Sequence, residues 1–146
     1  MGSSPQHHGR VAAIDLGKRR VGLAVSDELG LLAHPRSALE GGNEKRLLEQ
    51  LSALVEEEGV IRFLVGHPLS MSGRGGVAAQ RAARFCQRLA NATGVDVELV
   101  DERLTSHEAA RRLTEAGASK AEARARVDGE AAAIILQQWL DAHRAG

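Results

Sequence analysis

The fold is decided between residues 11 and 26, which read VAAIDLGKRRVGLAVS. Two apolar runs rich in small and branched residues flank a turn at Gly17-Lys18-Arg19-Arg20, and the second run covers Val21 to Val25. Short runs of this kind on either side of a turn are typical of a β-hairpin. The sequence therefore predicts a sheet that begins with two antiparallel strands.

Further strands and helices follow outward from the hairpin. A third strand is expected around Leu31 to Ala38, at an edge of the sheet because Pro35 cannot donate a ladder hydrogen bond. Asn43 then caps a helix, a buried strand is predicted at Ile61 to Val65 and a later strand at Val95 to Val100, with a helix between them. Strands joined through a helix pair in parallel. The expected fold class is α/β, with a sheet that is antiparallel first and parallel later.

Two more helices are expected in the C-terminal third of the chain. Thr105 and Glu108 have the spacing of a capping box, which predicts a short helix from there to about Gly117. A final helix runs to about Ala142, and Asp128 falls on the same face as the apolar residues Ala131, Ala132, Ile135, Leu136 and Trp139. A carboxylate aligned with a core-facing stripe calls for a functional explanation.

Bulk properties favour one domain in a reducing compartment. The chain has 146 residues, and one domain is expected over residues 11–143, with residues 1–10 as a flexible leader or a remnant of cloning. The 19 basic and 19 acidic residues cancel, so attraction to nucleic acid must come from local clusters. Cys86 has no partner for an internal disulfide, and no apolar run approaches the roughly 20 residues that cross a bilayer. These features predict a cytoplasmic protein without membrane contact.

Four carboxylates stand at positions that favour chemistry. Asp15 closes a central strand, Asp101 and Glu102 come directly off the last strand, and Asp128 lies near the start of the final helix. Ligands of parallel sheets bind at the carboxyl ends of the strands, and Mg²⁺ and Mn²⁺ prefer oxygen ligands. Each acid also has a plainer interpretation, as a turn residue, a surface charge or a helix-start residue. Their conjunction favours a site for divalent cations.

Positive groups near these acids are candidates for binding phosphate. The loop from Ser70 to Gly76 carries three glycines and an arginine. It either offers backbone N–H groups to a phosphate or serves as an ordinary connection. The candidate nucleic-acid-binding residues are Lys18, Arg19, Arg20, Arg74 and Arg103.

Four motifs in series resemble one family. They are Ala13-Ile14-Asp15-Leu16-Gly17 with the run from Arg20 to Asp27, Val65-Gly66-His67-Pro68-Leu69 with Gly73, the run from Val100 to Ser106, and Asp128-Gly129-Glu130-Ala131-Ala132 leading into Ile135-Leu136-Gln137. Together they cover nearly the whole chain in the right order. The chain resembles the YqgF proteins, also called RuvX, which are described as pre-16S rRNA nucleases or Holliday junction resolvases.

The resemblance implies an RNase H-like fold with a mixed five-stranded sheet flanked by helices. It carries the catalytic, metal-binding acids onto Asp15, Glu102 and Asp128. Glu102 is favoured because related nucleases usually place a single acid at that strand end, and Asp101 remains the alternative. The loop departs from the family pattern, with Ser70 and Ser72 where Asn and Asp are more typical. This departure weakens the case for a role of the loop in phosphate or metal contact.

The resulting hypothesis is a metal-dependent nuclease that hydrolyses phosphodiester bonds with Mg²⁺ or Mn²⁺. Asp15 is expected to bridge two ions, with the other two acids holding one each. The expected role is processing of the 5′ end of pre-16S rRNA, resolution of Holliday junctions, or both, by a monomer or homodimer. The alternative is a non-catalytic nucleic-acid-binding factor for ribosome assembly on the same fold. A phosphotransferase of the actin class is disfavoured, because the chain is short for two domains that close on ATP.

Overall fold

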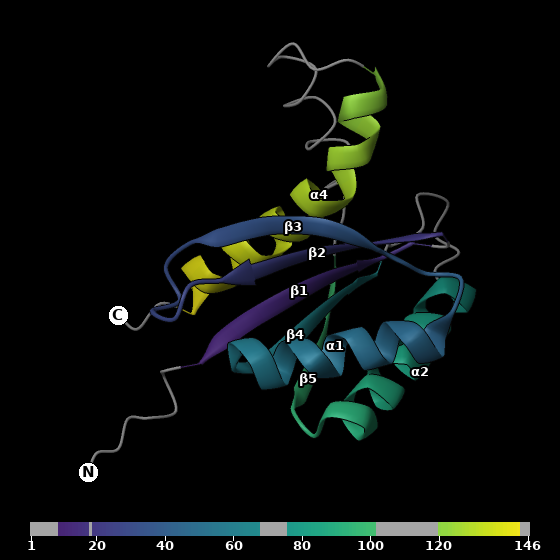
Figure 1. The fold of residues 1–146 in the computed structure, drawn as a ribbon, viewed down its shortest axis with the longest axis horizontal. Helices are drawn as coiled ribbons and strands as arrows, with labels where there is room; N and C mark the ends of the chain where they lie inside the picture. Colours follow the sequence, from purple (N-terminus) through teal and green to yellow (C-terminus); the bar gives the residue numbers. More distant parts are fainter. Residues whose placement is uncertain (1–8, 18, 68–75, 102–119, 144–146) are drawn as a thin grey trace.

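The chain folds into a five-stranded sheet with helices on both faces (Figure 1). The computed structural model describes residues 9–17, 19–67, 76–101 and 120–143. The predicted helix between Thr105 and Gly117 lies outside these residues. The elements are, in chain order, β1 (Arg10–Leu16), β2 (Arg20–Ser26), β3 (Ala33–Glu40), α1 (Glu44–Glu58), β4 (Val60–His67), α2 (Gly76–Thr93), β5 (Asp96–Asp101) and α4 (Lys120–Ala142).

The strands lie in the order β3-β2-β1-β4-β5, so the first strand of the chain is the central one. β1 pairs antiparallel with β2 and parallel with β4, and β5 pairs parallel with β4. This confirms the hairpin, the edge strand that contains Pro35 and the mixed sheet. β3 begins at Ala33 rather than Leu31, because the Asp27 carboxylate accepts hydrogen bonds from the N–H groups of Leu31 (2.8 Å) and Leu32 (3.1 Å). These bonds hold both residues outside the strand, just after the turn at Glu28 and Leu29.

The prediction of a buried strand from Ile61 to Val65 is wrong for its first two residues, because Ile61 is exposed and Arg62 is half-buried. In the β1–β4 ladder Arg10 pairs with Val60 and Val11 pairs with Arg62, so Ile61 has no partner on β1. It is the extra residue of a β-bulge, and its side chain is 45% exposed. The residues from Phe63 to Val65 are fully buried, as expected for a strand inside a covered sheet.

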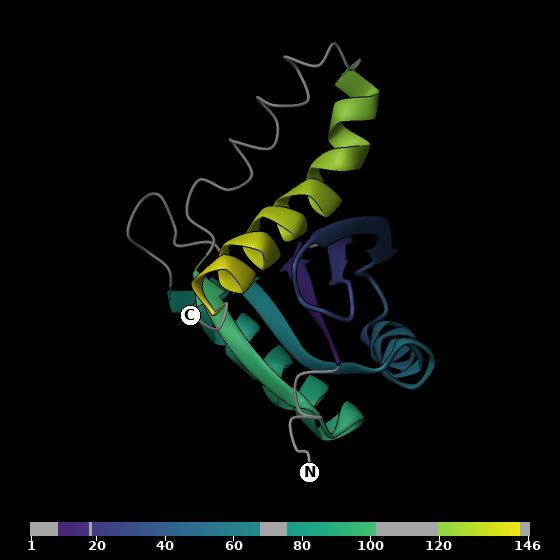
Figure 2. The same cartoon turned by 90° about the vertical axis from the view of Figure 1, so that its left-hand side faces the viewer.

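Helices α1 and α2 cover one face of the sheet and α4 covers the other (Figure 2). α1 has the cap predicted at Asn43, whose side chain accepts from the N–H of Arg46 (3.1 Å), and it ends at Gly59, which adopts a left-handed φ of 71°. The core on this side is built from branched and aromatic residues, including Ile14, Phe63 and Phe85. No described helix has the length and apolar character needed to cross a membrane.

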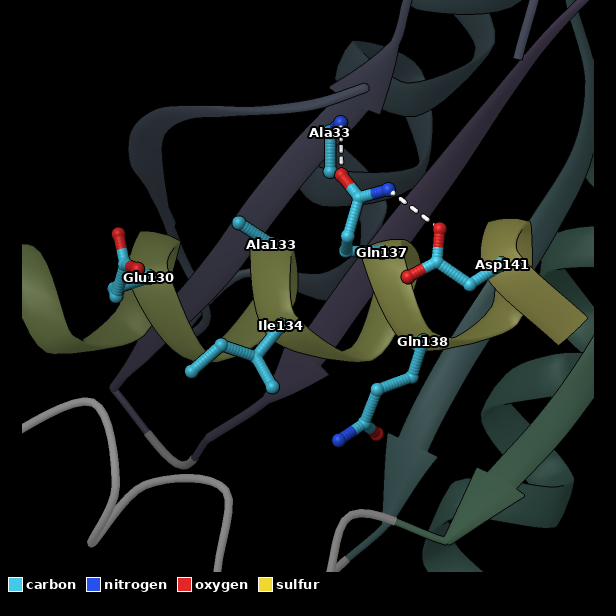
Figure 3. A pocket seen from close by; sticks show the side chains of 7 residues that line it. All are labelled: Ala33, Glu130, Ala133, Ile134, Gln137, Gln138 and Asp141. Atoms are coloured by element: carbon cyan, nitrogen blue, oxygen red, sulfur yellow. Dashed lines mark hydrogen bonds between the residues drawn. The ribbon is translucent and has the colours of Figure 1, made fainter. Parts of the chain in front are cut away.

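The core beneath α4 is made largely of small side chains. Ala13 and Ala24 of the sheet meet Ala132 of the helix, and Gly129 lies against the backbone of β3. Gln137 ties the helix to the start of β3, because its side chain accepts from the N–H of Ala33 (2.9 Å; Figure 3) and donates to the carbonyl of Leu31 (3.0 Å). The N-terminal turns of α4 project beyond the sheet (Figure 1).

The contact at Gly129 predicts an unusual response to alanine. A Cβ at this position would lie 2.9 Å from the carbonyl oxygen of Arg36, closer than packing allows. Gly to Ala in a helix interior ordinarily stabilises by up to about 1 kcal/mol. Here we expect Gly129→Ala to lower the free energy of unfolding by about 1–2 kcal/mol, because overpacking outweighs propensity.

Urea unfolding measures this change, and Gly42→Ala is the matched control. A Cβ on Gly42 meets nothing within 4 Å, so this variant should stay within about 0.5 kcal/mol of the parent. A Gly129→Ala variant more stable than the parent would show that α4 does not approach β3 this closely.

A second prediction concerns the pH dependence of stability that an ion pair at the C-terminal end of α1 produces. The Arg36 guanidinium donates to both carboxylate oxygens of Glu58 (3.0 and 2.6 Å), and this lowers the pKa of Glu58 below its ordinary value of 4.5. A lowered pKa stabilises the folded state above pH 4.5, and the contribution is lost as the pH falls through the folded-state pKa. Because the pair is partly exposed, it contributes no more than about 1 kcal/mol.

We therefore expect Glu58→Gln to be less stable than the parent at neutral pH, with the difference shrinking as the pH falls below 4.5 and through the lowered pKa of Glu58. Urea unfolding across this range measures the effect. Glu57→Gln, an exposed neighbour on the same helix, should show no such pH dependence. Equal curves for the two variants would contradict a role for the ion pair.

Candidate functional site

Asp15 occupies the carboxyl end of the central strand, between two glycines. Its neighbour on β2 is Gly22 and its neighbour on β4 is Gly66, and Gly66 in turn pairs with Val100 of β5. Adjacent strands lie about 4.8 Å apart, so the backbones of Asp15 and Val100 are separated by roughly 10 Å across this row. Because neither neighbouring glycine has a side chain, the sheet leaves space on both sides of the Asp15 carboxylate.

The alternation of β1 puts Asp15 on the face that α4 covers. Val11 and Ala13 belong to the α4 core, whereas Ala12 and Ile14 belong to the core under α1 and α2. Asp15 continues the first series. Its side chain is half-buried, near the carboxyl end of β1, where the part of the sheet covered by α4 ends.

The backbone of Asp128 enters the same region from α4. The next residue, Gly129, contacts Arg36 of β3, which pairs with Leu23 of β2, which pairs with Ile14 of β1. Ile14 precedes Asp15. The two predicted acids are more than a hundred positions apart in the chain, and this row of contacts brings their backbones toward one end of the sheet.

The remaining predicted site residues divide into described and undescribed positions. Asp101 is the last residue of β5, in register with His67 of β4. Arg19 and Arg20 are exposed where β2 begins, and the Arg19 carbonyl accepts from the N–H of Gly41 (2.7 Å). Four predicted site residues lie outside the described residues, namely Lys18, Arg74, Glu102 and Arg103. The Ser70–Gly76 loop also lies outside them, except for Gly76 itself.

Within the described ranges, no group of three or more His, Cys, Asp or Glu side chains is arranged to hold a metal ion. The predicted ligand set is not covered by that observation, because it includes Glu102. Cys86 packs against the core under α2, and burial raises the pKa of its thiol. A thiol with a raised pKa is a poor nucleophile, so Cys86 is a structural residue.

Two pockets lie at opposite ends of the sheet. One, of about 160 Å³, begins directly after Asp15 and is lined by Leu16, Gly17, Gly41, Glu44, Leu47, Arg81, Arg84, Phe85 and Arg88. The other, of about 330 Å³, lies between α4 and the start of β3, near Gln137 and Asp141 (Figure 3). Ala33 of this second pocket pairs with Ser26, at the end of the sheet remote from Asp15. The first pocket therefore borders the residues that directly follow Asp15, on the face covered by α1 and α2, whereas the second extends along α4 to Glu130, two residues after Asp128.

The three arginines of the first pocket are not among the sequence-predicted residues. They recur at positions 81, 84 and 88, a helical spacing, in a segment without acidic residues. That spacing is the signal by which sequence reasoning could have found them.

Residues 9–142 match a family model described as "RuvX: Holliday junction resolvase". The chain belongs to the RuvX family. A relative from Anaeromyxobacter sp. (strain Fw109-5) is 46% identical over 93% of this chain and 99% of its own length, and one from Chloroflexus aurantiacus (strain ATCC 29366 / DSM 635 / J-10-fl) is 41% identical over 92% and 88%. Both relatives carry the name "Putative pre-16S rRNA nuclease".

Solved structures agree with the fold that the resemblance implies. This RuvX family member superposes on Thermus thermophilus RuvC in complex with a Holliday junction substrate with a TM-score of 0.58 and 18% identity, over 92% of this chain and 95% of RuvC. A second structure of the same RuvC gives a TM-score of 0.51 at 16% identity, over 91% and 94%. At these identities the likeness concerns the fold, and it confirms the predicted RNase H-like architecture.

Proposed function

We propose that this RuvX family member is a metal-dependent nuclease that hydrolyses phosphodiester bonds. Its substrates are the 5′ end of pre-16S rRNA, branched DNA, or both, in keeping with the names of its relatives and of its family. The observation that carries the proposal is the position of Asp15. This acid closes the central strand, with a glycine on each side and the carboxyl ends of β4 and β5 in line with it.

The proposed metal ligands are Asp15, Glu102 and Asp128. Carboxylate oxygens suit Mg²⁺ and Mn²⁺, and three of them leave coordination places for water and phosphate. On β5 the residues Glu98 and Val100 contact α4, the same face that Asp15 occupies. Continuing that alternation by two residues favours Glu102 over Asp101 as the acid in phase with Asp15.

In the proposed mechanism the protein binds and orients the phosphodiester. When bound, the divalent cations neutralise phosphate charge and lower the pKa of the attacking water. Asp15, fixed by ladder hydrogen bonds on two sides, supplies a rigidly placed carboxylate. Arg19 and Arg20 begin β2 at the same end of the sheet and attract the backbone of the nucleic acid, as do Lys18, Arg74 and Arg103.

The test is cleavage of labelled RNA, single-stranded DNA and a four-way junction during titration with Mn²⁺ and Mg²⁺. We expect Asp15→Asn to retain its fold by circular dichroism and to lose metal-dependent cleavage. The loss should exceed the roughly 10–100-fold cost of removing a group that only supports a ligand. The amide keeps the size of the side chain and removes its charge, so the change reports on the carboxylate.

Asp96→Asn is the matched control, because Asp96 begins β5 at the opposite end of the sheet and its side chain is 78% exposed. This variant should cleave like the parent. Undiminished cleavage by Asp15→Asn would exclude the proposed site. Binding without metal-dependent cleavage by the parent would instead favour the non-catalytic assembly factor.

A further inference from the structure

A row of arginines on α2 borders the pocket beside Leu16 and Gly17. Arg81, Arg84 and Arg88 are all exposed and share one helix face. At 1.5 Å of rise per residue the row is about 10 Å long. We propose that it binds the phosphodiester backbone of a nucleic-acid strand that extends from the Asp15 site. This inference rests on the proposed function and names a binding surface for it on the face opposite α4.

The charge of the row is only partly neutralised by the protein. The Arg88 guanidinium donates to both carboxylate oxygens of Glu44 on α1, with Nη2 2.9 Å from Oε1. Arg81 and Arg84 make no ion pair or side-chain hydrogen bond with the part of the chain that the structure describes. The pairing fixes one end of the row, and two guanidinium groups remain available to an anion.

Two arginines elsewhere on the sheet differ in this respect. Arg36, in the middle of β3, pairs with Glu58, and Arg62, at the end remote from Asp15, pairs with both Asp96 (3.5 Å) and Glu98 (3.4 Å). In a chain whose formal charge is zero, the available positive charge on α2 therefore lies at the Asp15 end. A polyanion would be attracted there rather than to the molecule as a whole.

The surface is suited to phosphates and not to bases. Proteins that hold single strands through their bases use exposed aromatic side chains for stacking. The chain has two phenylalanines, one tryptophan and no tyrosine: Phe63 and Phe85 are buried, and Trp139 stacks on His143 on the α4 side. Without an aromatic platform, contact goes through guanidinium–phosphate hydrogen bonds, which are indifferent to sequence.

The row and Asp15 are adjacent along the chain as well as in space. Leu16 follows Asp15 directly and lines the pocket, and consecutive Cα atoms are about 3.8 Å apart. Strand alternation turns Asp15 toward α4 and Leu16 toward α2. A strand of nucleic acid that crosses the carboxyl end of β1 at Gly17 therefore passes from Asp15 on the α4 face to Arg81 and Arg84 on the α2 face.

The decisive experiment measures binding without cleavage. Fluorescence anisotropy of a labelled single-stranded RNA, a DNA of the same sequence and homopolymers is recorded in EDTA over a series of KCl concentrations. The test variant is R81Q/R84Q. The control is R10Q/R62Q, which removes the same charge from the opposite end of the sheet.

We expect R81Q/R84Q to bind all probes more weakly and with little dependence on sequence. Each phosphate contact on a single strand contributes about 0.7 to the slope of log affinity against log salt, so the slope should fall by about 1.4. The R10Q/R62Q control should keep the parent slope. Equal slopes for the two double variants, or loss of binding confined to one homopolymer, would overturn the inference.

Cleavage by the same variants separates this inference from the proposed nuclease. One outcome is that the parent binds but does not cleave, while R81Q/R84Q still has a smaller slope of log affinity against log salt. In that case the inference about the arginines is supported and the nuclease proposal fails. If R81Q/R84Q binds and cleaves like the control, the arginine surface fails and the nuclease proposal stands. Circular dichroism of all variants confirms that they are folded.

Discussion

α4 approaches the sheet so closely that position 129 has no room for a Cβ, and the candidate site depends on this contact. Gly129 lies against the carbonyl of Arg36, and Ala132 packs near Ala13 and Ala24 of the two central strands. Small side chains allow a helix to sit close to a sheet, and the dense interior leaves little freedom to slide or tilt. Gln137 adds two hydrogen bonds to the polar backbone just before and at the start of β3. Together these contacts fix the distance of α4 from the sheet and its position along the strands.

The consequence is that the candidate acids are positioned by different parts of the fold. Asp15 is held by ladder hydrogen bonds of the central strand, whereas the backbone of Asp128 is held by side-chain packing of α4. A substitution in the small-residue core therefore changes the relation between the two without touching either. Displacements of about 1 Å are enough to impair a catalytic arrangement. Packing beneath α4 is in this sense part of the site, although none of its residues carries a reactive group.

The sequence predicted those features that follow from local patterns. The hairpin, the edge position of Pro35 and the cap at Asn43 each depend on a few neighbouring residues, and the motif around Asp15 led to the correct family. The bulge at Ile61 was missed because it arises from the register between two strands, which no apolar run reveals. The glycines beside Asp15 were also beyond reach, since Gly22 and Gly66 become its neighbours only when the strands pair. The arginine spacing on α2 was visible, but its relation to Asp15 was not.

Overall neutrality is compatible with binding a polyanion because ionic screening makes the interaction local. At physiological ionic strength the Debye length is about 8 Å, so a phosphate near Arg81 responds to charges within that range and little to those beyond it. The acids that balance the chain include Asp96 and Glu98, which lie on β5 beside Arg62. Ion pairing at that end leaves little net electrostatic potential of either sign, whereas Arg84 at the other end forms no ion pair with any residue that the structure describes. The distribution of ion pairs, rather than the net charge, decides where this molecule attracts phosphate.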